Sequence, residues 1–223
     1  MTERPPRPPL RTRRLGAVPY PEAVVLQEEL VARRRAGEIA DTLLLLEHPH
    51  VITLGSGGNP AHVLLDEGER KRRRIDLYRA SRGGDVTYHG PGQLVAYPIL
   101  DLKPDRKDLH RYLRDLEEAL VRTAAAFGVN AHVRPGLTGV WTGRGKLAAI
   151  GVRVSSGWIT SHGVALNVST DASYFGAIIP CGIPDAVAVS LETELGREVT
   201  MESVQIAFAE EFAAVFGRRL RWT

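Results

Sequence analysis

The sequence predicts an α+β fold, in which helices pack against a β-sheet. Three stretches place apolar residues at helical spacing, and several shorter stretches are uniformly apolar or alternate between apolar and polar residues, as strands do. The two kinds of stretch are interspersed without the regular strand–helix–strand order of a parallel α/β fold. A chain of 223 residues with 43% hydrophobic content can bury one sizeable core, so one main domain is expected.

The N-terminus differs in composition from the rest of the chain. Residues 1–14 are rich in Pro and Arg and offer little to bury, so we expect a disordered basic tail, followed by a single domain over residues 15–223. No apolar run approaches the length of a membrane span, and no signal-peptide layout is present. These features favour a cytoplasmic protein without a membrane partner.

The basic residues are clustered. The net charge is +3, and much of the excess comes from the tail and from residues 70–74. Such clusters are usually solvated faces, although a basic surface also suits an acidic protein partner. Because no aromatic residues are interleaved with the arginines, we expect no nucleic-acid partner.

The first half of the domain predicts one helix and four strands. The helix is expected over residues 21–36, with Pro21 in its first turn and Gly37 at its end. The strands are expected over residues 42–46, 51–54, 75–79 and 93–99. The first two flank His48-Pro49 and are predicted to be neighbours in one sheet.

The second half adds two helices and a meander of strands. The clearest helix in the chain is expected over residues 108–127, as scaffold, and the last over residues 201–216 with Thr200 as its cap. The strands are expected over residues 140–142, 146–154, 158–168 and 219–222. In the third of these, alternation gives one bulky face and one small face with Gly163 and Ala165, which suits close approach of a ligand.

A glycine-rich stretch connects the strands at 75–79 and 93–99. It reads Arg82-Gly-Gly-Asp-Val-Thr-Tyr-His-Gly-Pro-Gly-Gln. Glycine lets a backbone approach a ligand closely, so this stretch predicts a wall of exposed backbone amides, although a tight connection between strands is the alternative. It is not a phosphate-binding loop, because no Gly-Lys-Ser/Thr sequence or helix follows.

Cys181, the single cysteine, excludes an intrachain disulfide and a multi-cysteine metal site. Its setting between Pro180 and Gly182 predicts a turn, where a thiol is more accessible than in a packed core. Lys146 begins a mostly apolar strand, so its amine is expected near the end of the sheet. A Cys–His dyad with His89 or His162 as base is an alternative that spacing leaves open.

Four ordered motifs resemble the signatures of the lipoyl(octanoyl) transferase family (LipB). They are the glycine-rich stretch from Arg82, then Lys146-Leu-Ala-Ala-Ile-Gly, His162-Gly-Val-Ala-Leu-Asn and Ile179-Pro-Cys-Gly-Ile. The similarity extends from about Leu15 to the C-terminus. It implies the fold of biotin and lipoate protein ligases, which is a mixed sheet with packed helices plus a smaller sheet.

The resemblance also implies a reaction. An octanoyl (or lipoyl) group would pass from acyl carrier protein to Cys181 as a thioester, and then to a lysine of a lipoyl domain, in the first step of protein lipoylation. The implied acceptors are the lipoyl domains of 2-oxoacid dehydrogenase E2 subunits and the glycine cleavage H protein. Lys146 is implied as the partner of Cys181, where it would favour the thiolate and later accept a proton. No metal, nucleotide or other cofactor is called for.

Two alternatives belong to other classes of protein. An ATP-dependent lipoate or biotin protein ligase of the same fold would activate a free acid, and a cysteine relay would then be superfluous. A non-catalytic homologue that binds lipoyl domains would not need both Lys146 and Cys181.

By the resemblance, small and polar residues line the acyl pocket. They are Arg82, Gly83, Gly84, Asp85, Val86, Thr87, Tyr88, His89, Ala149, Ile150, Gly151, Gly163, Val164 and Ala165. One departure is visible, because Val189 stands before Ser190 where the family usually has threonine. We expect this change to alter packing or a hydrogen bond and to leave the Cys–Lys dyad intact.

Overall fold

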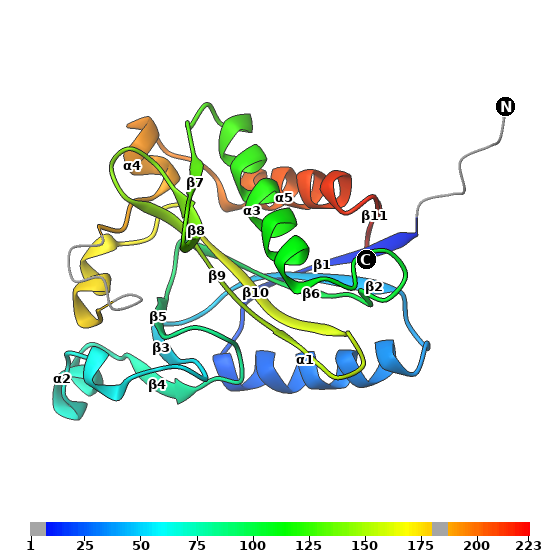
Figure 1. Cartoon of the computed structure of the whole chain (residues 1–223). Helices are drawn as coiled ribbons and strands as arrows, with labels where there is room; N and C mark the ends of the chain where they lie inside the picture. The colour runs from blue at the N-terminus through cyan, green and yellow to red at the C-terminus, as the bar shows by residue number, and fades with distance from the viewer. Residues whose placement is uncertain (1–7, 180–186) are drawn as a thin grey trace, which may run out of the picture.

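Two β-sheets with helices packed against them make up the computed structural model, which describes residues 8–179 and 187–223 (Figure 1). β1 runs parallel to both of its neighbours in the larger sheet, and the remaining pairs are antiparallel. Within the described residues, eight strands form this sheet in the order β11 (Arg219–Trp222), β1 (Pro9–Ala17), β2 (Asp41–Glu47), β6 (Gln93–Ile99), β10 (Thr160–Asn167), β9 (Lys146–Val154), β8 (Leu137–Trp141) and β7 (His132–Arg134). The predicted α+β class with a mixed sheet is confirmed.

The smaller sheet carries the glycine-rich stretch. Its strands lie in the order β4 (Asp76–Arg79), β3 (Val51–Leu54) and β5 (Val86–His89). β3 pairs in parallel with β4 and antiparallel with β5. Ile52 and Tyr88 lie in its own small core together with Ile178. The polypeptide therefore passes from β4 through the glycines to β5, and then crosses to β6 of the larger sheet.

Helices cover both faces of the larger sheet (Figure 1). α1 (Tyr20–Arg35) packs on one face, while α3 (Leu109–Ala126) and α5 (Met201–Val215) pack on the other. Leu44 and Leu46 of β2 pack toward α1, whereas Leu43 and Leu45 belong to the core under α3 and α5. Because β2 is buried on both faces, its sequence is uniformly apolar rather than alternating.

The three long helices were predicted to within two residues at each end. Asp108 caps α3 by accepting hydrogen bonds from the backbone N–H groups of His110 and Arg111, and Thr200 caps α5 through the N–H of Ser203. The sequence did not predict several short elements. They are α2 (Glu67–Arg72), α4 (Leu191–Leu195), two 3₁₀ segments at Pro60–His62 and Ala172–Ala177, and the strands β5 and β7.

Two predictions about strands are wrong. The expected tail extends too far, because residues 9–14 belong to β1, which lies between β2 and β11; Leu10 and Thr12 point inward and are fully buried. The strands at 42–46 and 51–54 are not neighbours, because β2 pairs with β1 and β6 whereas β3 belongs to the smaller sheet. Residues 1–7 of the expected tail lie outside the described residues.

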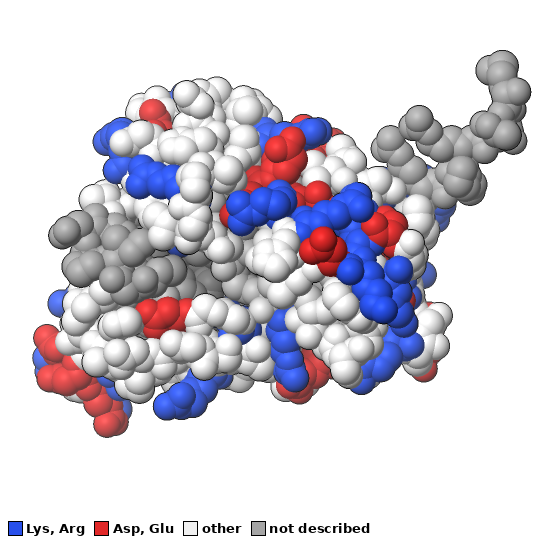
Figure 2. Space-filling model, in the orientation of Figure 1, with Lys and Arg blue, Asp and Glu red and all other residues white. Residues whose placement is uncertain are grey.

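Charges of both signs share the surface. Figure 2 shows basic and acidic side chains side by side on the face that it presents. The basic cluster at 70–74 overlaps α2, whose first turn contributes Glu67 and Glu69, and Lys71 pairs with Glu67. This supports a solvated face there. No helix among the described residues is long and apolar enough to cross a membrane.

Candidate active site

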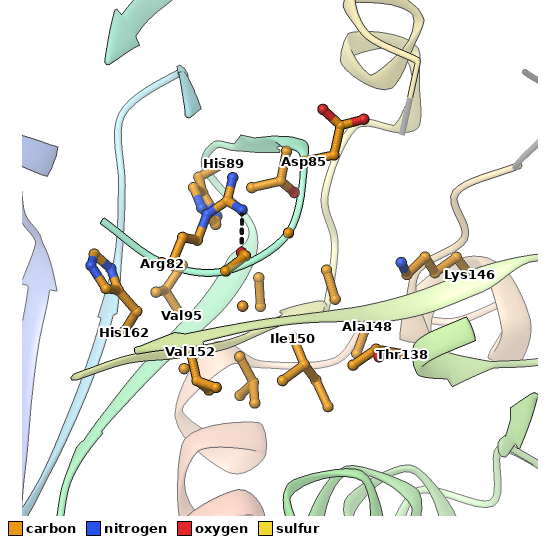
Figure 3. Close-up of a pocket in the computed structure, with 18 of the residues that line it drawn as sticks. Arg82, Asp85, His89, Val95, Thr138, Lys146, Ala148, Ile150, Val152 and His162 are labelled. Atoms are coloured by element: carbon orange, nitrogen blue, oxygen red, sulfur yellow. Dashed lines mark hydrogen bonds between the residues drawn. The ribbon is translucent and has the colours of Figure 1, made fainter. Parts of the chain in front are cut away.

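A cavity of about 510 Å³ lies along β9, next to the glycine-rich stretch. This volume is in the usual range for small-molecule sites. Figure 3 shows Arg82, Asp85 and His89 on one side of β9 and Ile150 and Val152 on the other, so the cavity borders both faces of the strand. Every predicted acyl-pocket residue except Tyr88 lines it, as does Lys146.

The glycine-rich stretch is held against β9 by its backbone. The N–H of Gly83 donates to the carbonyl of Val152 at 2.9 Å. A Cβ at Gly151 would lie 2.8 Å from Cδ of Arg82, so only glycine allows the two segments to approach this closely. Ala149 shares the face of Gly151 and lies opposite Ala165 on β10. Small residues therefore line the side of the cavity that faces the glycines.

Arg82 is anchored to the smaller sheet. Its Nη2 donates to both the carbonyl and the hydroxyl oxygen of Thr53, at 2.7 and 2.8 Å, and its Nη1 donates to the carbonyl of Gly83 at 3.1 Å. The side chain is 7% exposed. Its guanidinium is therefore a fixed charge at one end of the cavity.

His89 belongs to a chain of buried hydrogen bonds whose donors can be assigned. Asn167 Nδ2 donates to the carbonyl of Val189 at 2.9 Å, so its Oδ1 accepts from Gln93 Nε2 at 3.0 Å. Gln93 Oε1 must then accept from His89, at 2.7 Å, and the proton of the neutral imidazole lies on Nδ1. Nε2 of His89 is left as the acceptor nitrogen.

Both candidate histidines are poor bases. Burial, reinforced by nearby His48, lowers the pKa of His89 to about 3. Burial and the charge of Arg82 lower the pKa of His162 to about 4. A group with so low a pKa accepts protons weakly at neutral pH. Figure 3 places both near Arg82, away from Lys146 at the other end of β9.

Lys146 is held by the strands around it. It begins β9 and pairs with Trp141 of β8, whose ring centroid lies 5.2 Å from Nζ. Its N–H donates to the carbonyl of Val187 at 2.8 Å, and its carbonyl accepts from the N–H of Val189 at 3.0 Å. Ala188, between these two residues, lines the cavity. The chain that follows residue 186 thus returns to the sheet directly beside Lys146.

Cys181 falls within residues 180–186, outside the described residues. The segments that flank it are described. Before it, the N–H of Ile179 donates to the carbonyl of His62 at 2.9 Å, and after it Val187 pairs with Lys146.

One expectation about the pocket residues is wrong, and a second residue lines the cavity in a different way from the one expected. Tyr88 does not line the cavity, because alternation along β5 turns it into the small core, where its hydroxyl lies 2.7 Å from Nδ1 of His50. Gly163 lines the cavity only through its backbone, because a Cβ there would overlap the carbonyl oxygen of Ala96 on β6. His162, with a φ of 55°, departs from extended backbone geometry at this point, although the pairing of β10 with β9 continues through it.

The sequence reasoning missed several lining residues. Leu109 and Leu113 of α3, expected to be scaffold, line the cavity, and so does Trp141. An aromatic residue five positions before a candidate lysine, across a Gly-Arg-Gly turn, was the available signal for Trp141.

Val189 stands where threonine was expected. Its side chain is buried in the main core, and its backbone makes the hydrogen bonds to Lys146 and Asn167. Ser190 next to it caps α4 in a capping box with Thr193. Since the polar contacts of Val189 come from its backbone, the substitution leaves them intact.

Comparison with solved structures shows the fold. A lipoate-protein ligase A bound with ATP superimposes with a TM-score of 0.80 at 18% identity, over 96% of this chain and 88% of the other. A bipartite lipoate protein ligase from Thermoplasma acidophilum, described together with its E2 lipoyl domain, gives a TM-score of 0.72 at 18% identity, over 98% of this chain and 87% of that one.

Sequence relatives are more similar. An octanoyltransferase of Rubrobacter xylanophilus is 51% identical over 95% of this chain and 96% of its own, and one of Solibacter usitatus is 49% identical over 92% and 91%. Residues 19–213 match the family model of the lipoyl protein ligase A/B catalytic domain. The chain therefore belongs to the lipoyl protein ligase A/B catalytic domain family.

Proposed function

We propose that this protein is an octanoyltransferase in which Cys181 carries the acyl group and Lys146 moves the protons. The observation that carries the proposal is a cavity with an apolar lining that reaches Lys146, beside which the chain returns to the sheet at Val187, six residues after Cys181. The sequence relatives are named octanoyltransferases, which supports octanoyl as the acyl group.

In the first half-reaction, the Cys181 thiolate attacks the carbonyl carbon of octanoyl-acyl carrier protein. The carbon–sulfur bond to the carrier breaks as the bond to Cys181 forms. A free thiol has a pKa near 8.5, so a lysine cation next to it raises the thiolate fraction at neutral pH. The ammonium of Lys146 then gives its proton to the departing carrier thiolate, which leaves Lys146 neutral.

In the second half-reaction, the neutral amine of an acceptor lysine attacks the Cys181 thioester. The amide bond forms, the Cys181 thiolate leaves, and the attacking nitrogen passes one proton to Lys146. This step restores the starting pair of thiolate and ammonium. The proton lost when the acceptor ammonium becomes an amine goes to solvent, so the protons balance over the cycle.

The acyl chain is assigned to the side of the cavity that faces the glycines. Ala149, Gly151 and Ala165 provide the room there, and Val95 adds an apolar wall. Burial of each methylene is worth about 0.8 kcal/mol, which is enough to favour a chain that fills the space. Backbone N–H groups of the glycine-rich stretch are the proposed donors to the oxyanion.

The proposed partners are octanoyl-acyl carrier protein as donor and lipoyl domains as acceptors, including those of 2-oxoacid dehydrogenase E2 subunits and the glycine cleavage H protein. The fold neighbour from Thermoplasma, described with an E2 lipoyl domain, supports this class of acceptor. The reaction is placed in the cytoplasm, where reducing conditions keep a single thiol free. The proposed mechanism uses no cofactor.

Intact-protein mass spectrometry after incubation with octanoyl-acyl carrier protein tests the proposal. The wild type should gain one octanoyl group that hydroxylamine removes, and Cys181→Ser should gain none. Incubation with octanoate and ATP is the matched control, because a ligase would use this pair without a thiol. Full transfer by Cys181→Ala, or transfer that depends on ATP, would contradict the proposal.

A further inference from the structure

Trp141 and Lys146 form a cross-strand pair at the end of the cavity. They lie opposite each other in the antiparallel ladder of β8 and β9, so their side chains are direct neighbours. Nζ of Lys146 lies 5.2 Å from the ring centroid of Trp141, within the range of a cation–π interaction. The indole is 3% exposed, which limits competition from water.

The backbone beneath this pair leaves Lys146 little freedom. A Cβ at Gly139 would lie 2.9 Å from Cε of Lys146 and 3.5 Å from Nζ, so the end of the lysine side chain rests on bare backbone. Gly139 also has a φ of 125°, which other residues rarely adopt. The end of the Lys146 side chain therefore packs against the backbone of Gly139, and its amine lies next to the Trp141 ring.

The turn that joins the two strands is braced by Thr142. Its N–H donates to the carbonyl of Gly145 at 2.8 Å, and its hydroxyl accepts from the N–H groups of Arg144 and Gly145 at 3.1 and 3.3 Å. With Val187 and Val189 bonded to the backbone of Lys146, the main chain is fixed and only the side chain of Lys146 can move.

The Trp141 ring is itself held by a second cation. Cζ of Arg134 lies 4.5 Å from the ring centroid, and its Nη2 donates to the carbonyl of Thr142 at 3.3 Å. The indole Nε1 is buried and has no hydrogen-bond partner in the described part of the chain. Among the described residues, Trp141 therefore makes its polar contacts through the π face of its ring. Replacing Trp141 by phenylalanine would remove no hydrogen bond there.

We propose that Trp141 is a positioning residue for Lys146, which holds the amine where it exchanges protons with the thiol and the acceptor. The proposal rests on the proposed function of Lys146. Trp141 acts through the ammonium, so its effect belongs to the steps that use that charge.

The test compares Trp141→Leu, which removes the π face, with Trp141→Phe, which keeps one. Rate constants for acylation of Cys181 and for transfer to a lipoyl domain are measured in single turnovers, together with alkylation of Cys181 by iodoacetamide against pH. Trp141→Leu should slow both half-reactions by roughly 2- to 30-fold and shift alkylation to higher pH, while Trp141→Phe should lie between Trp141→Leu and the wild type, because phenyl is a weaker cation–π partner than indole. Equal losses in the two variants, or none in Trp141→Leu, would overturn the proposal.

A series of fluorinated tryptophans at position 141 separates a weaker π face from an effect of misfolding. In a Trp158→Phe, Trp222→Phe background, Trp141 is the one remaining tryptophan, and each added fluorine weakens the π face with little change in shape. Rates should fall stepwise with fluorination, and a flat series would overturn the proposal. In a Lys146→Met background the series should be flat. A wild type that never acquires the thioester would instead refute the proposed function.

Discussion

At one end of the cavity, His89, His162 and Arg82 are buried, and each has hydrogen-bond partners within the fold. At the other end, Lys146 is only partly buried and lies against the ring of Trp141, next to Val187 and Val189. The first end is rich in groups that could carry protons, yet burial keeps its histidines neutral at pH 7.

Polar side chains in one pocket therefore need not share a role. The histidine end is a rigid wall, where His89 donates to Gln93, His162 hydrogen-bonds with Ser81 and Arg82 donates to Thr53. The lysine end combines a charge with partial exposure to solvent. We therefore expect substitutions at the lysine end to affect chemistry, and those at the histidine end to affect stability and shape.

Lys146→Met should have the strongest effect on the reaction. Loss of the ammonium should slow transfer by about 10²- to 10⁴-fold, the usual contribution of a positioned acid–base group. Alkylation of Cys181 by iodoacetamide should shift to higher pH, since the thiolate loses its neighbouring cation. Steady-state transfer and the alkylation profile measure the two effects.

Lys146→Arg is the matched control for charge, because arginine keeps the cation but does not release its proton readily. It should spare thiolate formation, as read from the alkylation profile, and slow transfer to the acceptor. If Lys146→Met leaves the alkylation profile unchanged while His89→Ala or His162→Ala shifts it, the two ends have exchanged roles and a Cys–His dyad replaces the Cys–Lys pair.

Gly163→Ala and Ala165→Leu should separate stability from specificity. A Cβ at Gly163 meets the backbone of β6, so Gly163→Ala should cost about 1–3 kcal/mol of unfolding free energy and lower turnover of all donors alike. Ala165→Leu adds volume to the proposed acyl space and should penalise eight-carbon donors more than four-carbon donors. Urea denaturation and rates with four-, six- and eight-carbon donors provide the measurements.

If Gly163→Ala lost activity selectively with long-chain donors, the added Cβ would have to reach the acyl space. An equal loss across donors in Ala165→Leu would remove Ala165 from the proposed pocket.

The sequence predicted the long helices because their periodicity and caps are local, as with Asp108 and Thr200. It missed β1, where arginines at alternate positions hid the buried Leu10 and Thr12. Only the pairing of β1 with two distant strands shows which of its faces is covered. Residues 9–14 therefore resembled a tail.

The sequence predicted which residues belong to the candidate site better than it predicted the directions in which they point. The motifs contain more than half of the residues that line the cavity, but strand alternation failed where His162 adopts a positive φ. It could not show that Gly163 faces β6, or that Tyr88 belongs to a separate core. These outcomes depend on contacts between segments that lie far apart in the sequence.

The histidine end predicts a dependence of stability on pH. His89 and His162 titrate at about 3 and 4 in the fold, below the value near 6.5 of an unfolded chain, so the unfolded state binds more protons between these values. Stability is therefore full above pH 6.5 and is lost as the pH falls, by about 2 kcal/mol per histidine at pH 5. Urea denaturation of the wild type and His89→Gln at pH 8 and pH 5 tests this, and an identical pH dependence in both proteins would contradict it.

The smallest expected effect is at the link between the two ends. Val189 bonds to the carbonyl of Lys146 through its N–H and accepts from Asn167, which connects through Gln93 to His89. Because the backbone makes these bonds, Val189→Thr should keep the transfer rate within about twofold and lower stability by about 1 kcal/mol, from burial of one hydroxyl. Val189→Ala is the control for lost volume, and both are followed by single-turnover transfer and urea denaturation. A rate change of about tenfold in Val189→Thr but not in Val189→Ala corresponds to about 1.4 kcal/mol in the barrier. It would show that the side chain at position 189 reaches the reacting groups and that this link affects the chemical step as well as stability.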